Sequence, residues 1–180
     1  AINWSDRKQP LQPTVPEAAK AAGKSAGVVT SVQWSHATPA GLSNAHNVDR
    51  DNYVEIANAM LAGEVMDVVM GCGNPDFDNN GQAVKKAKAK EFKYVGGPET
   101  WKAIEAARAT ADGTYQGFRP VSTKAEFEAL TSGPTPRRVV GTAQVATTLQ
   151  QARQAPKSKD ADADTPPNAN VPSLATMVQG

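Results

Sequence analysis

Both histidines of the chain lie in one polar stretch, residues 35–50, with the sequence SHATPAGLSNAHNVDR. His36 and Thr38 are near its beginning, His46 follows, and Arg50 ends it. Imidazole, hydroxyl and guanidinium groups are the kinds of side chain that line active sites. The same residues would also suit a polar loop that enters a helix, so their position in the fold has to decide between the two.

The position of residues 35–50 in the predicted fold makes a site possible but does not establish one. Residues 27–33 form a β-branched run that predicts a buried strand, and ligands of open α/β sheets bind beyond the carboxyl ends of strands. Thr38 followed by Pro39 is also typical of a helix start, with Thr38 as N-cap. Arg50 is twelve residues further on, about 18 Å away along one continuous helix. A common site therefore requires a turn, for which residues 43–49 are suitable. From the residues alone, a capped helix with two solvated histidines is favoured.

Four other patterns are better explained by structure than by chemistry. Residues 76–81 (DFDNNG) match the first half of a calcium loop, but Ala87 stands where the bidentate glutamate belongs, so we predict a polar turn. The glycine-rich residues 71–75 predict a tight turn after a strand. The lysines of residues 85–90 predict the solvated face of a helix. Cys72 is the sole cysteine, which excludes a disulfide within the chain and predicts a buried small residue.

Composition bounds the class of protein. The 180 residues suffice for one domain, and 39% hydrophobic with 21% charged residues is typical of a globular protein. A net charge of +1 gives no electrostatic case for nucleic acid or an anionic membrane as partner, and no apolar run is long enough for a transmembrane helix. The chain begins without Met and ends in a pattern that starts a helix, so we expect a segment of a longer polypeptide.

The elements that would position these side chains alternate between strand and helix. Capping boxes at Thr14 and Thr123 mark two helix starts. The alternation predicts an α/β fold with a mostly parallel sheet and helices on both faces. We expect residues 1–153 to form this α/β segment, residues 154–172 an exposed linker or loop, and residues 173–180 the start of a further helix. The predicted strands span residues 27–33, 65–70, 92–95, 118–121 and 138–141, and the predicted helices span residues 15–22, 51–62, 82–90, 99–108 and 124–130.

Several segments together resemble the metal-dependent alkaline phosphatase family, and a bacterial-type member in particular. The resemblance is most specific over residues 14–73 and 171–178, and looser over residues 98–170. It implies a three-layer α/β/α sandwich. The segments that carry it are TVPEAAKAAG (14–23), VVTS (28–31), HATPA (36–40) leading to Arg50, DVVMG (67–71) and VPSLATM (171–177).

The resemblance also implies a reaction and roles for three residues. In the family a serine attacks a phosphate monoester between two zinc ions, and water hydrolyses the phosphoseryl intermediate, with a magnesium ion nearby. Thr38 matches the hydroxyl ligand of magnesium, which prefers oxygen donors. His36 stands where members carry Asp or His and where the side chain supports the magnesium shell. Arg50 matches the arginine that binds phosphate, with one additional residue between it and Thr38.

One departure from the family shapes the prediction. The zinc ions need several histidines and aspartates, whereas both histidines here lie in residues 35–50, and the Asp-Ser nucleophile motif is absent from the sequence. We therefore expect an internal segment that is active only with the remaining segments of the enzyme. The family further implies a periplasmic or secreted location and a possible homodimer. The alternatives are a non-catalytic βα module that binds a phosphorylated ligand or partner, and a sulfatase- or phosphodiesterase-like relative.

Overall fold

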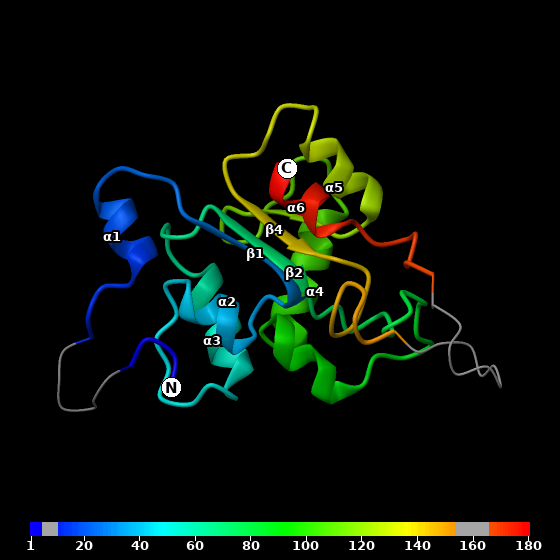
Figure 1. Ribbon diagram of the computed structural model, residues 1–180, viewed down its shortest axis with the longest axis horizontal. Coiled ribbons are helices and arrows are strands. Elements are labelled where there is room, and N and C mark those ends of the chain that lie inside the picture. The colour runs from blue at the N-terminus through cyan, green and yellow to red at the C-terminus, as the bar shows by residue number, and fades with distance from the viewer. Residues whose placement is uncertain (5–10, 154–165) are drawn as a thin grey trace.

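A parallel sheet organises the computed structural model, which describes residues 1–4, 11–153 and 166–180 (Figure 1). Every neighbouring pair in the sheet order β1-β2-β4-β3 is parallel, so the carboxyl ends of the strands meet at one edge. The predicted α/β class with a mostly parallel sheet is confirmed. The strands are β1 (Gly27–Gln33), β2 (Val68–Cys72), β3 (Arg119–Val121) and β4 (Val139–Thr142).

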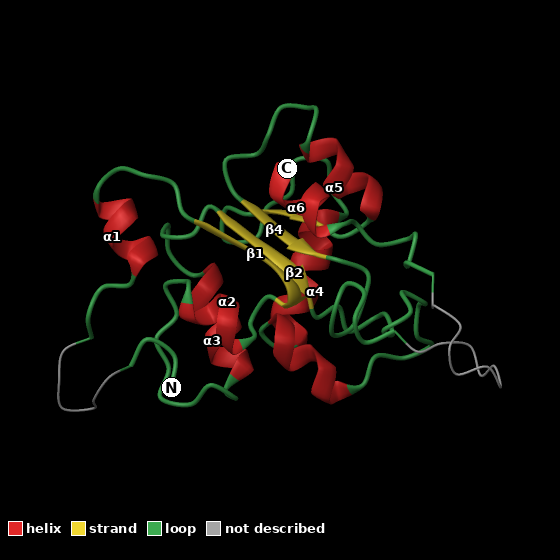
Figure 2. Cartoon of the chain, viewed as in Figure 1, coloured by secondary structure: helices red, strands yellow, loops and turns green. Residues whose placement is uncertain are grey.

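Helices cover both faces of this sheet, as the cartoon shows (Figure 2). Alternate strand residues face opposite sides. Val28, Val69 and Val140 pack in one hydrophobic cluster with α2, α3 and α4, while Met70 and Val139 pack in another with α5 and α6. The result is three layers. The helices are α1 (Val15–Ala21), α2 (Ala37–Gly41), α3 (Tyr53–Leu61), the 3-10 helix η1 (Ala89–Val95), α4 (Pro98–Arg108), α5 (Lys124–Leu130) and α6 (Leu174–Gln179).

Both predicted capping boxes are present. Thr14 Oγ1 accepts a hydrogen bond from Glu17 N at 3.3 Å, and the Glu17 carboxylate accepts one from Thr14 N at 2.7 Å. Thr123 and Glu126 make the same reciprocal pair at the start of α5. Each box satisfies backbone donors that the first turn of a helix leaves unpaired, which fixes where the helix begins.

The predictions of a helix over residues 82–90 and of a strand over residues 92–95 are wrong. Val84 N donates to Asp76 O at 2.9 Å, and Asp78 N donates to Gln82 O at 2.9 Å. Because the backbone of residues 82–84 pairs with residues 76–78, it cannot form the hydrogen bonds of a helix. The chain then enters η1, which buries Val95 and ends at Gly96 in a left-handed conformation (φ 86°). The lysines of residues 85–90 are mostly exposed, but they do not share a helical face.

Several element boundaries also differ from the prediction. The N-cap of α2 is His36, which places Thr38 inside the first turn, where Pro39 is tolerated because no backbone donor is needed there. The N-cap of α3 is Asn52 rather than Asp51, and β2 begins at Val68 rather than Val65.

Residues 154–165 of the predicted linker lie outside the described residues, so the domain boundaries stay a prediction. Among the described helices, none is long and apolar enough to cross a membrane.

Candidate active site at the carboxyl edge of the sheet

The chain turns directly from the end of β1 into α2. Ser35 is buried, and its hydroxyl donates to the carbonyl oxygen of Tyr94 at 2.8 Å. His36 N donates to Gln33 O at 2.9 Å and closes the turn. This geometry puts His36 and the exposed Thr38 just beyond the carboxyl end of a parallel strand, the place where ligands bind in open α/β sheets.

His36 carries a buried polar atom without a partner. Its Nδ1 makes no hydrogen bond to any described residue, although the atom is shielded from solvent. Buried polar atoms are nearly always satisfied, so an unsatisfied one marks a position for a ligand, an ion or a water molecule. A fully solvated His36, which the residue types alone favour, does not fit this buried nitrogen.

His46 is engaged in structure. Its Nδ1 lies 2.8 Å from Asn3 O and its Nε2 lies 3.2 Å from Glu17 Oε2. Burial by itself raises the pKa of Glu17, but hydrogen bonds from Thr14 and His46 outweigh it and hold that pKa below its ordinary value. The imidazole thus ties the segment after α2 to α1 and to residue 3.

The loop between Thr38 and Arg50 does turn, as a common site requires. Helix α2 ends at Gly41, and Asn47 exchanges backbone hydrogen bonds with Ile2 at 2.7 and 2.9 Å. The side-chain amide of Asn3 lies within 3.3 Å of three carbonyl oxygens of the same loop, those of Ala40, Ser43 and Ala45. Residues 2–3 therefore brace the loop that carries Arg50.

Arg50 presents an open guanidinium. Its side chain is 53% exposed, and the carboxylate nearest to it among the described residues, that of Asp51, lies 4.0 Å from Nε. An ion pair of that length and exposure contributes little, so both edges of the guanidinium remain available to an oxyanion.

Three side chains that no sequence pattern predicts meet at the start of α3, just after Arg50. Tyr53 begins α3, its ring centroid lies 4.8 Å from that of Tyr94, and Lys93 Nζ lies 4.9 Å from both centroids. Burial raises the pKa of Tyr53, as do Tyr94 and Asp51, whereas the charges of Lys93 and Arg50 lower it. These residues come from segments forty positions apart, and nothing in their spacing predicts the contact.

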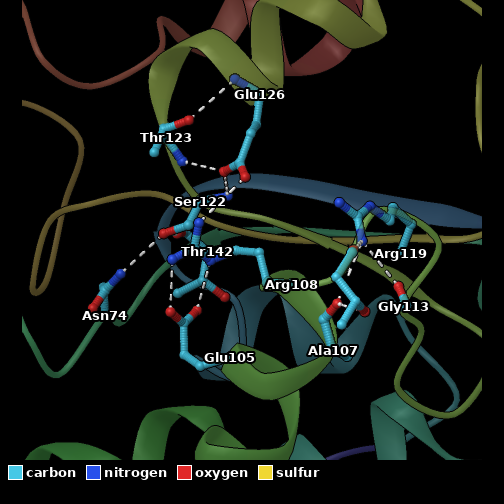
Figure 3. Close-up of polar contacts among 11 residues, drawn as sticks. Asn74, Glu105, Ala107, Arg108, Gly113, Arg119, Ser122, Thr123, Glu126 and Thr142 are labelled. Atoms are coloured by element: carbon cyan, nitrogen blue, oxygen red, sulfur yellow. Dashed lines mark hydrogen bonds and ion pairs between the residues drawn. The ribbon is translucent and has the colours of Figure 1, made fainter.

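The remaining strand ends are closed by a polar network (Figure 3). Asn74 Nδ2 donates to Ser122 Oγ at 3.2 Å, and Ser122 Oγ donates to Thr142 O at 2.8 Å. Trp34 Nε1 donates to Thr142 Oγ1 at 3.1 Å. All four residues are buried, and they follow or end β1, β2, β3 and β4. The network connects the four strand ends to one another through buried hydrogen bonds.

Three charged side chains in the same view pair with one another (Figure 3). Arg108 pairs with Glu105 at 2.8 Å and with Glu126 at 3.2 Å. Burial by itself raises the pKa of Glu126. Backbone hydrogen bonds from Thr123 and Ser122 and the charge of Arg108 outweigh burial, so the pKa of Glu126 lies below its ordinary value. We assign these three residues to structure.

Acidic side chains do not gather into a metal centre in the part of the chain that the structure describes. It contains no group of three or more His, Cys, Asp or Glu residues that could hold an ion. Asp76 Oδ2 accepts from Trp101 Nε1 at 2.9 Å, and Asp78 Oδ1 accepts from Asn80 N at 2.8 Å. Both aspartates are thus occupied within the fold, which agrees with the predicted polar turn rather than a calcium loop.

A family model described as alkaline phosphatase matches residues 2–180 of the chain. The chain belongs to the alkaline phosphatase family. Its curated relatives include Alkaline phosphatase 4 and Alkaline phosphatase 3 of Bacillus subtilis (strain 168), each 36% identical over 88 residues. That alignment covers 46% of this chain, and 18% and 19% of the two relatives.

One solved structure supports the assignment of the chain to this family. The crystal structure of a cold-active alkaline phosphatase from the psychrophile Shewanella sp. is similar with a TM-score of 0.54 and 25% identity, over 82% of this chain and 28% of that one. The predicted family and fold are confirmed. The chain spans under a third of the length of these relatives.

Proposed function

We propose that this chain forms one wall of the active site of a phosphate monoesterase, in which Arg50 binds the phosphate group of the substrate. The observation that carries the proposal is the open guanidinium of Arg50, three residues before Tyr53, whose ring meets that of Tyr94 beside the end of β1. A planar guanidinium donates two parallel hydrogen bonds to the oxygens of a phosphate. Phosphoryl transfer depends mainly on positioning and charge stabilisation, and an arginine supplies both.

Thr38 and His36 fit a place beside a magnesium ion. The exposed Thr38 hydroxyl is the hard oxygen donor that magnesium prefers, and the ion keeps several of its waters. The unpartnered Nδ1 of His36 is suited to accept a hydrogen bond from such a water. When bound, magnesium would supply positive charge and an activated water near the phosphate. Thr38 is then its ligand, and His36 orients the shell around it.

Zinc does not fit the described residues, since they hold no cluster of three suitable ligands. We therefore assign the two zinc ions, and the serine that forms the phosphoseryl intermediate, to other segments of the same enzyme. The short coverage of the relatives, 18% and 19%, supports this division. Activity then requires assembly with those segments. A homodimer and a periplasmic or secreted location are further expectations from the family.

The test is Arg50→Ala in the assembled enzyme, with Arg137→Ala as the matched control. Arg137 is also exposed, but it precedes β4 at the opposite edge of the sheet. We expect Arg50→Ala to lower kcat/KM by ~10²- to 10³-fold and to weaken inhibition by inorganic phosphate, because transition-state donors are lost. The Tm of Arg50→Ala should stay close to that of the unmodified enzyme. The kcat/KM and phosphate inhibition of Arg137→Ala should also stay close to the unmodified values. Unchanged phosphate inhibition in Arg50→Ala would contradict the assignment.

A further inference from the structure

Lys93 is held by two aromatic rings rather than by a carboxylate. Its ammonium lies 4.9 Å from the ring centroids of both Tyr53 and Tyr94, and the two rings meet edge to face at 68°. Each ring face attracts a cation, which fixes the ammonium in place. Among the described residues no carboxylate oxygen lies within 4.0 Å of it. Its positive charge is therefore localised but not neutralised.

The same rings anchor this group at the carboxyl edge of the sheet. The Tyr94 carbonyl accepts the Ser35 hydroxyl at the end of β1. Gly73, just after β2, has a φ of 107°, and a side chain there would begin 3.2 Å from Tyr94 Cβ. Gly73 thus lets Tyr94 pack closely against the strand ends. The lysine cannot drift far from the edge without breaking these contacts.

Tyr53 connects Lys93 to Arg50. It lies three residues after Arg50 at the start of α3, and the charges of both cations act on its hydroxyl. Lys93 has no carboxylate within 4.0 Å in the described part of the chain, and the ion-pair partner of Arg50, Asp51, lies 4.0 Å away on an exposed surface, so the two cations form an incompletely neutralised pair around a half-buried phenol. Unneutralised cations at a ligand-binding edge attract substrates that carry negative charge.

We propose that Lys93, framed by Tyr53 and Tyr94, binds a second anionic group on the alcohol part of the substrate. The enzyme would thereby prefer phosphate monoesters whose leaving group carries a carboxylate or another phosphate. The inference rests on the proposed phosphate-binding role of Arg50. The guanidinium suits the two oxygens of the transferred phosphate, whereas an ammonium is a point charge that suits any second anion, and the rings offer an apolar flank for the organic part.

The experiment compares two substrates of the assembled enzyme, 4-carboxyphenyl phosphate and 4-carbamoylphenyl phosphate, which have the same shape and differ by one charge. We expect Lys93→Gln to raise KM about 5-fold for the carboxyl ester, with little change in kcat. KM for the carbamoyl ester and inhibition by inorganic phosphate should stay as in the unmodified enzyme. Lys93→Arg should restore most of the preference, and salt should weaken it because the charges are partly exposed.

Two results would overturn the proposal. An equal rise of KM for both esters would show that Lys93 does not read the second charge, and so would no change for either. Arg50→Ala separates this failure from failure of the proposed function, because it should weaken the binding of both esters and of inorganic phosphate alike. Arg50→Ala could leave KM and phosphate inhibition unchanged while Lys93→Gln still raises KM for the carboxyl ester alone. In that case the proposed role of Arg50 is wrong and the proposed role of Lys93 stands.

Discussion

The carboxyl edge of the sheet has two regions of opposite character. Around the ends of β2, β4 and β3, the buried polar groups of Asn74, Ser122 and Thr142 pair with one another and with Trp34. Beyond β1, His36 Nδ1 has no partner in the described part of the chain, and the guanidinium of Arg50 has only a distant one. In the first region the polar groups bind one another within the fold, whereas in the second region they remain available to a ligand.

The contrast indicates where a ligand belongs. A buried network that is fully satisfied rigidifies the strands and gains nothing from a ligand. An unsatisfied polar atom costs free energy in the isolated fold and is stabilised when a partner arrives. Substitutions in the first region should therefore change stability, and substitutions in the second should change ligand binding.

Among further substitutions, the largest effect is expected on the open side, in Thr38→Val of the assembled enzyme. Loss of the hydroxyl removes an oxygen donor from the proposed magnesium site, so we expect the magnesium concentration for half-maximal activation to rise ~10- to 100-fold. Calorimetric titration with magnesium should show the same shift. Thr110→Val, at another exposed threonine, is the control. A magnesium titration that coincides with that of the unmodified enzyme would refute the role.

On the closed side, Thr142→Val should destabilise the protein without changing phosphate binding. The substitution leaves the buried Trp34 N–H without its acceptor, which costs about 1–3 kcal/mol of the free energy of unfolding. Urea denaturation measures the loss, and inhibition by inorganic phosphate provides the second readout. If Thr142→Val weakens phosphate binding at unchanged stability, the division of the edge into two regions fails.

The smallest effect concerns the contact that supports the open side, between Glu17 and His46. Because the pKa of Glu17 is lower in the folded state, its carboxylate stabilises the fold above its ordinary pKa of 4.5, and that stabilisation is lost as the pH falls through the folded value. Glu17→Gln should cost ~0.3–1 kcal/mol at pH 7, and this cost should shrink as the pH falls below 4.5. Urea denaturation across this range measures it. A cost that does not depend on pH would contradict the ionic contribution.

The sequence predicted the elements whose signals are local. Thr14 and Thr123 begin helices because a capping box needs only the residues it contains. Cys72 is buried, as predicted, and burial raises the pKa of its thiol. The helix predicted over residues 82–90 is wrong because their Ala- and Lys-rich composition favours a helix, whereas pairing of residues 82–84 with residues 76–78 decides the backbone there.

The candidate site was only partly accessible from the sequence. The β-branched run before His36 placed the stretch at a strand end, which the structure confirms. The choice of Thr38 and Arg50 came from family resemblance, since residue types alone favoured a capped helix. Lys93 could not be found, because its neighbour Tyr53 meets it only through packing between segments distant in the chain.

The bracing of the Arg50 loop by Ile2 and Asn3 has a consequence for limited proteolysis. The loop depends on hydrogen bonds to a segment about forty residues earlier, and that segment contributes little to the two hydrophobic clusters beyond Ile2. A protease that separated residues 2–3 from the rest would free the loop while leaving the sheet folded. We expect such a nicked enzyme to lose affinity for phosphate while its far-UV circular dichroism spectrum stays that of the folded protein.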